Sequence, residues 1–342
     1  MRIQHHPELT GKRVLITGAS GFLGFPLSQY LLREGAIVGG LARKMGSICS
    51  IEGEENFAFI ACDLENGEET VRKFKEFRPD ILYHLAAHPD AKEELPQHHA
   101  TIMSNILGTV NALEAFRASG GDVFIYGDSC KVYGDAGAPA LEAQPVQPLS
   151  SYAIAKVAGW EYCKLYSRLH GLAAVSVRPT LVYGPGQGFN LISYVVNAVL
   201  EARNVLKLDG GTQTRDPLFL DDAIRAFALV AARGRQLNGR VVNISGGREI
   251  SVADLARLIV SLMGSTMRVE TDLSRMRPTE TMRSYCDIRE AFEMIGWQPA
   301  IPLQEGLRRT AAQMSRAYRL SFLDRASIAL SGPGFSPSLQ TA

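Results

Sequence analysis

The sequence lacks the features that mark secreted, zinc-bound or membrane-embedded proteins. Its five cysteines are odd in number, widely spaced and form no Cys-X-X-Cys pair, so neither a disulfide framework nor a zinc site is indicated. The N-terminal stretch has no apolar signal core, and no window approaches the roughly 18 apolar residues of a membrane helix. We therefore expect a protein of the reducing cytoplasm with no metal and no membrane partner.

An excess of one charge sign is also absent. Lysine and arginine total 36 against 35 aspartates and glutamates, which gives a net charge of +1. This balance argues against a broad basic surface for a nucleic-acid polymer, so any anion site must be local. With 342 residues, 46% of them hydrophobic, the chain is long enough to bury a large core.

What the sequence does contain is an alternation of apolar runs with helix-like segments. Continuous runs rich in Val and Ile indicate parallel strands covered on both faces, and right-handed crossovers then give a doubly wound sheet. We therefore predict an α/β fold of the Rossmann type. The predicted strands are 13–17, 36–41, 57–61, 80–86, 122–126 and 173–177, and the helices between them are 22–34, a segment near 100–118, and 151–170.

The pattern changes after about residue 180, where glycine-rich loops interrupt it. Helix-like stretches follow near 190–203, 221–233, 251–263 and 303–319. We expect a dinucleotide-binding Rossmann domain made of 10–180 together with about 216–244. A smaller α+β substrate lobe would comprise 181–215 and 245–320, and 321–342 would be a mobile tail.

A glycine-rich turn follows the first predicted strand. TGASGFLG places Gly18, Gly21 and Gly24 between that strand and a helix, where a pyrophosphate meets the amides of a helix N-terminus. Glycine allows the close backbone approach that this contact needs. An ordinary strand-to-helix turn is the alternative, but the flanking strand and helix favour dinucleotide binding.

Cationic residues end the second predicted strand, at the position that reads the adenosine ribose. A carboxylate there selects NAD, whereas arginine accommodates the 2′-phosphate of NADP. Arg43 and Lys44 stand there, so we expect NADP rather than NAD, with a plain solvated pair as the alternative. Asp63, after the third strand, is a candidate acceptor for the adenine amino group or an exposed turn aspartate.

Tyr152 and Lys156 lie four residues apart in SSYAIAK and therefore on one helix face. A neighbouring ammonium favours the phenolate of a tyrosine, whose ordinary pKa is about 10. Ser129 follows a strand and can hydrogen-bond a substrate oxygen while hydride moves to the nicotinamide. Asn105 would support the site through water or backbone. The alternative is that Tyr152 and Lys156 only pack against the protein, with the lysine ammonium in solvent.

These motifs together resemble the extended short-chain dehydrogenases/reductases of the nucleotide-sugar epimerase/dehydratase family. The resemblance runs from about residue 10 to 320 and includes CDL, HLAA, NILGTVNALEA, SCKVYG, RPTLVYGPG, RDPLFLDD, NISGG and IGWQP. It implies a Rossmann-type domain, a C-terminal lobe that holds a nucleoside diphosphate-sugar, oxidation at sugar C4 by bound NAD or NADP, and a homodimer.

Carried over residue by residue, the resemblance implies that Ser129, Tyr152 and Lys156 are catalytic. It implies that Arg215 and Arg277 bind the diphosphate, although either arginine could instead pair with Asp216 or Glu280. The predicted cofactor-binding residues are Gly18, Ser20, Gly21, Phe22, Leu23, Gly24, Arg43, Lys44, Asp63, Leu64, Leu85, Ala86, Ala87, Asn105, Tyr152, Lys156 and Thr180. The predicted substrate residues are His88, Ser129, Asn190, Arg215 and Arg277.

The sequence departs from the family pattern directly after Ser129. The family's 4,6-dehydratases typically carry an acid pair or one glutamate there, whereas this chain has Cys130 and Lys131. A 4-epimerase needs no acid pair, so 4-epimerisation is favoured. An NADPH-dependent 4-keto-sugar reductase is the alternative. Another is an atypical dehydratase or epimerase with Cys130 and Lys131 as its acid/base pair, since a nearby cation lowers the pKa of a thiol.

Overall fold

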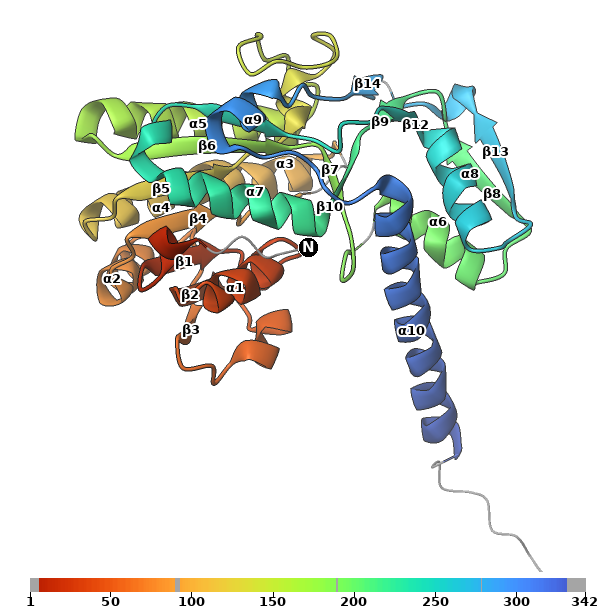
Figure 1. The fold of residues 1–342 in the computed structure, drawn as a ribbon, viewed down its shortest axis with the longest axis horizontal. Helices are drawn as coiled ribbons and strands as arrows, with labels where there is room; N and C mark the ends of the chain where they lie inside the picture. The colour runs from red at the N-terminus through yellow and green to blue at the C-terminus, as the bar shows by residue number, and fades with distance from the viewer. Residues whose placement is uncertain (1–5, 90–92, 189, 278, 331–342) are drawn as a thin grey trace, which may run out of the picture.

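The computed structural model describes residues 6–89, 93–188, 190–277 and 279–330, with side chains up to residue 320. Within these residues seven strands form one parallel sheet in the order β11-β6-β5-β4-β1-β2-β3 (Figure 1). The predicted doubly wound α/β fold is confirmed. The strands are β1 (Arg13–Thr17), β2 (Ile37–Ala42), β3 (Phe57–Ala61), β4 (Ile81–His84), β5 (Val123–Gly127), β6 (Ala173–Pro179) and β11 (Val241–Ile244).

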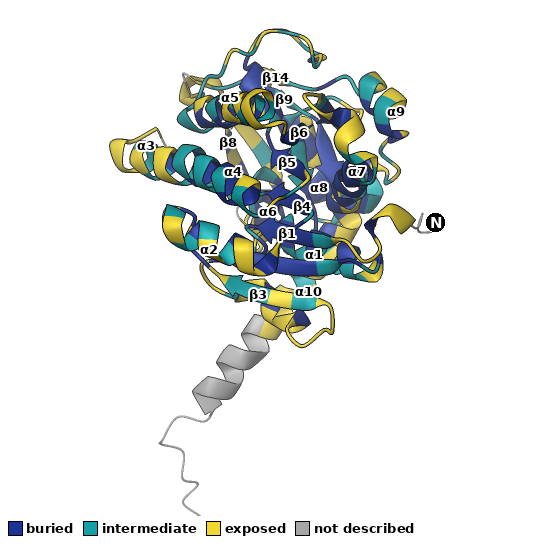
Figure 2. Ribbon diagram, turned by 90° about the vertical axis from the view of Figure 1, so that its left-hand side faces the viewer, coloured by how far each residue is buried: buried dark blue, intermediate teal, exposed yellow. Residues whose placement is uncertain are grey.

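Helices cover both faces of this sheet, and Figure 2 shows the buried strands between them. Side chains alternate along a strand, so Val14 and Ile16 of β1 pack on one face while Leu15 packs on the other. This alternation is why each strand reads as a continuous apolar run. One face carries α1 (Gly24–Arg33), α7 (Leu220–Arg233) and α9 (Arg289–Ile295), and the other carries α2 (Gly67–Phe77), α4 (Gly108–Ala118) and α5 (Ser151–His170).

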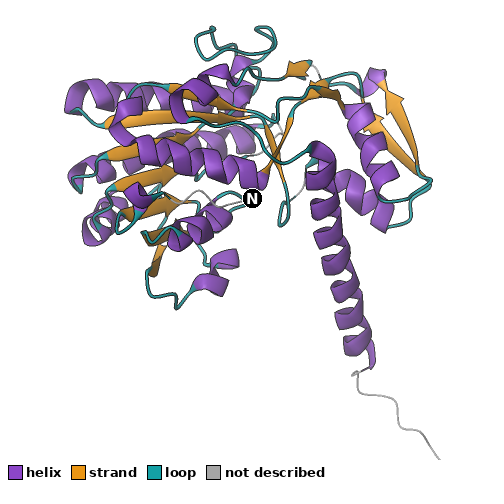
Figure 3. Cartoon of the chain, in the orientation of Figure 1, coloured by secondary structure: helices purple, strands orange, loops and turns teal. Residues whose placement is uncertain are grey.

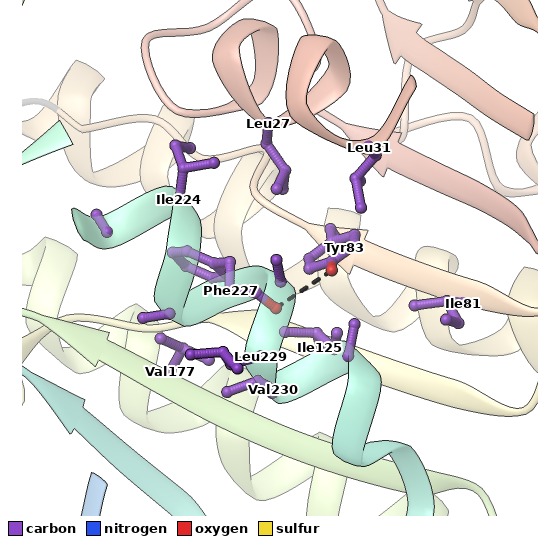
Figure 4. Packing of buried hydrophobic residues seen from close by; sticks show 14 of the residues in the cluster. Leu27, Leu31, Ile81, Tyr83, Ile125, Val177, Ile224, Phe227, Leu229 and Val230 are labelled. Carbon is purple, nitrogen blue, oxygen red and sulfur yellow. Dashed lines mark hydrogen bonds between the residues drawn. The ribbon is translucent and has the colours of Figure 1, made fainter. Parts of the chain in front are cut away.

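Helix α7 fixes the sheet to its helical layer through a packed aromatic contact. The Phe227 ring is fully buried and lies edge-on to Tyr83 of β4, with ring centres 6.3 Å apart. The Tyr83 hydroxyl donates a hydrogen bond of 3.2 Å to the Phe227 carbonyl, drawn in Figure 4. Burial raises the pKa of Tyr83 well above its ordinary value, so this hydroxyl remains a donor.

The C-terminal half adds smaller sheets and helices beside the large sheet, as Figure 3 shows. They share an apolar cluster that includes Ile192, Phe219 and Leu255. The elements are β7 (Leu181–Tyr183), α6 (Leu191–Leu200), β8 (Val205–Asp209), β9 (Thr214–Arg215), β10 (Pro217–Phe219), β12 (Ile250–Ser251), α8 (Val252–Leu262), β13 (Arg268–Asp272), β14 (Arg283–Ser284) and α10 (Leu303–Leu330).

Two sequence predictions about helices were wrong in extent. Helix α10 continues to Leu330, so the first ten residues of the predicted tail, 321–330, belong to a helix. The rest of that tail, 331–342, lies outside the described residues. The segment predicted near 100–118 divides into α3 (Leu95–Thr101), the π-helical turn η3 (Ile102–Leu107) and α4. A π turn widens the helix locally and leaves no trace in apolar periodicity.

The described part of the chain contains no helix with the length and apolar character of a membrane crossing. All five cysteines are free thiols. Among the described residues no group of three or more His, Cys, Asp or Glu side chains is arranged to hold a metal ion.

Candidate active site

The candidate residues gather where the parallel strands end. Strands β1, β2, β4, β5 and β6 all run in the same direction, so the loops that follow them emerge at one edge of the sheet. In doubly wound sheets this carboxyl edge is the place where ligands bind. Gly18, Arg43, Leu85 and Ser129 lie in four of these loops.

The glycine turn between β1 and α1 is too tight for larger residues. Gly18 has φ of +69°, and a Cβ added there would lie 2.9 Å from the Ala86 backbone. A Cβ at Gly24 would lie 2.3 Å from the Gly18 carbonyl. The Gly21 amide donates to that carbonyl at 2.9 Å. No side chain caps the N-terminus of α1, but the Phe25 amide already donates to the Gly21 carbonyl at 3.1 Å and Pro26 has no amide hydrogen. An anion at this helix end would therefore depend on the amides that precede Phe25.

A buried histidine fixes the neighbouring loop, Leu85–Ala87. His84 Nδ1 lies 3.0 Å from the Thr17 hydroxyl, and His84 Nε2 lies 3.0 Å from the Thr109 hydroxyl. The Thr17 oxygen also accepts a hydrogen bond from the Ala86 amide. Burial lowers the pKa of His84 to about 3, so the ring stays neutral and acts as a structural bridge. This bridge places Ala86 against Gly18.

The predicted ribose-reading residues lie at the end of β2. Arg43 and Lys44 are both exposed, and neither forms an ion pair with another described side chain. Ser47, in the turn that follows them, donates a hydrogen bond of 2.8 Å to the Ser20 carbonyl of the glycine turn. The two cations therefore belong to the same corner of the protein as the turn predicted to hold the pyrophosphate.

Asp63 and Leu64 follow β3 at the same edge. Asp63 is exposed, and one carboxylate oxygen accepts from the Glu65 amide at 3.1 Å, which leaves the other oxygen free of protein partners among the described residues. Leu64 is buried in the core cluster beneath it. This arrangement is compatible with both interpretations of Asp63, the adenine acceptor and the turn aspartate.

Asn105 supports the site indirectly. Its side chain is almost fully buried and clamps the backbone of His88, accepting from the His88 amide at 2.6 Å and donating to the His88 carbonyl at 3.1 Å. Both functional groups of the amide are therefore used to hold the loop after β4. This favours the predicted backbone support over direct contact with a cofactor.

Ser129, Tyr152 and Lys156 come together at the ends of β5 and α5. Lys156 is buried, and its Nζ donates to the Gly127 carbonyl at 2.6 Å. The same Nζ lies 5.7 Å from the centre of the Tyr152 ring. The Ser129 side chain lies close enough to Tyr152 to lower the pKa of the tyrosine. The structure thus brings together the three residues that the sequence predicts as catalytic.

The pKa values of this group differ from the sequence expectation. Burial, with the Asp128 and Cys130 charges, raises the pKa of Tyr152 well above 10, while the hydrogen bond from Ser129 opposes the rise. Burial also lowers the pKa of Lys156 to about 8, with Asp128 opposing. The protein alone therefore keeps Tyr152 neutral, because burial is the largest cause of the shift and disfavours the phenolate. A bound substrate and cofactor must add to the stabilisation of a phenolate.

Cys130 and Lys131 differ in what they face. Cys130 is buried in a small cluster, where its thiol lies 3.4 Å from the Ser284 hydroxyl. A hydrogen bond with Cys286 is the main cause that lowers the pKa of Cys130. Lys131 is exposed, and its Nζ lies 5.6 Å from the centre of the Tyr152 ring. Cys130 therefore packs against the C-terminal segment, whereas Lys131 lies beside Tyr152, the tyrosine that the sequence predicts as catalytic.

The segment around β14 brings the predicted phosphate arginines to the same place. Its backbone pairs with the loop after Tyr133, since the Ala140 amide donates to the Tyr285 carbonyl at 2.8 Å. Arg215 on β9 is about one-fifth exposed and forms an ion pair with Glu280. Arg277 is exposed and has no ion-pair partner among the described residues. Desolvation by the surrounding protein is the main cause that lowers the pKa of Lys131, and the charges of both arginines lower it further.

Two predicted ligand residues carry buried polar atoms that the described protein does not satisfy. Thr180, after β6, has a buried hydroxyl without a hydrogen-bond partner. Asn190 caps α6, where its side-chain oxygen accepts from the Ser193 amide at 2.9 Å, while its amide nitrogen has no partner. Buried polar atoms normally find partners, so both atoms fit positions that a ligand completes.

The sequence reasoning missed a buried ion pair behind Ser129. Asp128 accepts from the Ser129 amide at 2.8 Å and from Arg178 Nε at 2.7 Å. Arg178 also donates to the Tyr133 hydroxyl, which in turn donates to Asn243 on β11. The signal was present in the sequence, because an arginine inside the apolar run of β6 needs a buried partner.

This geometry agrees with the comparison to known proteins. Residues 14–245 match the profile described as "NAD dependent epimerase/dehydratase family". The chain belongs to the NAD-dependent epimerase/dehydratase family. It is an enzyme of the sugar-nucleotide epimerase and dehydratase class, and it carries the Rossmann fold of the extended short-chain dehydrogenases/reductases.

Relatives in this epimerase/dehydratase family align over most of the chain. A UDP-glucose 4-epimerase of Mycolicibacterium smegmatis is 34% identical over 310 residues, covering 87% of this chain and 97% of the relative. A UDP-glucuronate 4-epimerase of Thermodesulfobacterium geofontis is 28% identical, covering 86% and 94%. The UDP-glucuronic acid 4-epimerase of Bacillus cereus, solved with UDP-glucuronic acid and NAD, superposes with a TM-score of 0.83 at 28% identity, covering 89% and 99%.

Proposed function

We propose that this enzyme is a nucleotide-sugar 4-epimerase that acts through a 4-keto intermediate. The observation that carries the proposal is the placement of the Lys156 ammonium 5.7 Å from the centre of the Tyr152 ring and hydrogen-bonded to Gly127, two residues before Ser129, in a site that lacks a carboxylate at positions 130 and 131. The chain has the groups for reversible oxidation at C4 but not the acid pair of a standard dehydratase. The placement of Cys130 against Ser284 favours packing over acid–base chemistry for that thiol.

In the proposed reaction the protein moves one proton and orients one oxygen. Tyr152 accepts the proton of the C4 hydroxyl, while Ser129 donates a hydrogen bond to the same substrate oxygen. The Lys156 ammonium favours the phenolate, and because its pKa is about 8, this support is present below that pH and declines above it. Arg215 and Arg277 would bind the diphosphate, with Arg215 exchanging its Glu280 partner for phosphate oxygens.

The residues at the sheet edge fit a nicotinamide dinucleotide. The glycine turn would hold the pyrophosphate of the cofactor, and the buried Thr180 hydroxyl would form a hydrogen bond with the cofactor. Arg43 and Lys44 would contact its adenosine ribose. When bound, this cofactor supplies reversible hydride acceptance and return at C4. Return of hydride to the opposite face of the sugar gives the epimer, and no net oxidant is consumed.

We predict that the enzyme interconverts UDP-glucose and UDP-galactose, or the corresponding uronates, with its bound cofactor alone. Tyr152→Phe should lower turnover by at least about 100-fold, because it removes the proton acceptor and keeps the ring. Product formation can be followed by chromatography of the nucleotide sugars. Tyr162→Phe, on the exposed side of the same helix, is the matched control. Unchanged turnover in Tyr152→Phe would overturn the assignment.

A second candidate function is net reduction of a 4-keto sugar by NADPH. The exposed Arg43 and Lys44 favour it, because NADP-dependent reduction requires a 2′-phosphate site. Consumption of NADPH in proportion to product, with a keto-sugar substrate and no epimerisation, would replace the first proposal with this one.

We further propose that NADP binds more tightly than NAD. Arg43→Ala with Lys44→Ala should weaken NADP binding about tenfold or more and leave NAD binding nearly unchanged, since only the 2′-phosphate is lost as a partner. Calorimetric titration of NADP and NAD into the wild type and the double variant measures these affinities. Lys12→Ala, which removes an exposed cation before β1, is the control. Equal loss of both affinities, or tighter NAD binding by the wild type, would contradict the proposal.

A homodimer is also proposed, through the outer face of α5 and its neighbours α3 and η3. These packed elements expose apolar side chains that include Leu95, Ile102, Ile154, Leu165 and Leu169. Such a patch on adjacent helices is typical of an interface. Light scattering should give the wild type twice the mass of one chain. Leu165→Arg should reduce the measured mass to that of one chain, whereas Leu273→Arg, on an exposed turn, should leave it unchanged. A wild-type monomer at micromolar concentration would refute this interface.

A further inference from the structure

Lys131 stands at the reacting end of the site rather than at its margin. It is the second residue of the short helical turn after Ser129, and its amide donates to the Ser129 hydroxyl oxygen at 3.3 Å. Its ammonium lies 5.6 Å from the centre of the Tyr152 ring, almost the same distance as the Lys156 ammonium at 5.7 Å. Tyr152 therefore has two cations within reach of its ring, and only Lys156 is used by the proposed reaction.

Within the described residues no carboxylate forms an ion pair with the Lys131 ammonium. The acidic group with the largest charge effect on Lys131 is the Cys130 thiol, and the carboxylate with the largest effect, Glu280, is already bound to Arg215. The other charged neighbours, Arg215 and Arg277, are cations. Lys131 thus adds a positive charge that no described carboxylate pairs with, beside the tyrosine, in a region that the proposed diphosphate site already makes positive.

We propose that Lys131 binds a carboxylate on the sugar, so that the preferred substrate of this enzyme is a nucleotide-activated hexuronic acid. The inference rests on the proposed function, because it takes Tyr152 as the partner of the C4 hydroxyl. The substituents next to C4 are the C3 hydroxyl and the carbon attached at C5. In a hexose both are neutral, whereas in a hexuronic acid the C5 substituent is a carboxylate.

The selectivity follows from what each sugar offers the ammonium. A carboxylate gives Lys131 a charge-assisted hydrogen bond, about twice as strong as a neutral one. A neutral hexose replaces water around the ammonium without supplying a counter-charge, which leaves the cation desolvated and poorly paired. The uronate is therefore favoured both by attraction and by the penalty that the neutral sugar incurs.

The experiment compares holoenzyme variants on UDP-glucuronate and UDP-glucose. The wild type should show the higher kcat/KM on UDP-glucuronate. Lys131→Met keeps the length of the side chain without the charge, and it should lower kcat/KM on the uronate by about 10- to 100-fold while changing the neutral sugar by less than about threefold. Lys131→Arg keeps the charge and should retain most of the preference. Lys164→Met, an exposed lysine paired with Glu161 on α5, is the matched control.

Three results would overturn the inference. One result is an equal loss of kcat/KM on both sugars in Lys131→Met and Lys131→Arg, together with exchange of the C5 hydrogen in deuterated water that depends on Lys131. This result would make Lys131 an acid or base. Weaker binding of UDP alone to Lys131→Met would assign Lys131 to the diphosphate. Higher kcat/KM of the wild type on UDP-glucose would reject the uronate while leaving the 4-epimerase proposal intact.

A binding measurement keeps the inference separate from the proposed function. In the Tyr152→Phe background, calorimetry of UDP-glucuronate and UDP-glucose requires no turnover. If UDP-glucuronate binds more tightly than UDP-glucose and Lys131→Met removes this difference, the carboxylate contact is supported. This holds even if the wild type converts neither sugar, because that failure would reject only the 4-epimerase proposal. Equal binding of the two nucleotide sugars would overturn the contact.

Discussion

The hydrogen bond from the Lys156 ammonium to the Gly127 carbonyl, 2.6 Å long, ties helix α5 to the last residue of strand β5. Ser129 follows that strand two residues later, and Tyr152 lies one helical turn before Lys156, so this contact sets how the two hydroxyl groups face each other. Lys156 is buried, and a buried ammonium is stable only with such a partner. The proposed catalytic arrangement and the packing of α5 therefore depend on the same bond.

The parallel sheet accounts for the rest of the site. Because neighbouring strands end at one edge, segments far apart in sequence, from Gly18 to Thr180, reach a common ligand surface. The ion pair between Asp128 and Arg178 strengthens that edge from behind, and both side chains are nearly inaccessible to solvent. Removal of one partner from such a buried pair leaves an uncompensated charge, which typically costs about 3–5 kcal/mol. The polar network thus makes the position of Ser129 a property of the folded core.

Sequence reasoning identified what depends on local pattern and chemistry. The strands, the glycine turn and the Tyr152/Lys156 pair follow from periodicity and spacing, and the structure brings Ser129 to them. It could not foresee that Asn105 clamps His88, that Cys130 packs against Ser284, or that Lys131 lies over the Tyr152 ring. The residues in these contacts are far apart or irregularly spaced in sequence, so periodicity does not predict them. The raised pKa of Tyr152 was missed for a related reason, since burial is set by the whole fold.

A 4-epimerase requires that hydride leaves C4 of the sugar and returns to C4. A nucleotide sugar carrying deuterium at C4 tests it most directly, with the label in the product located by nuclear magnetic resonance. The account predicts that the product epimer retains nearly all the deuterium at C4. Deuterium found at C6 would indicate elimination, and loss of deuterium to a cofactor released in solution would indicate net oxidation or reduction. Either result would contradict a 4-epimerase.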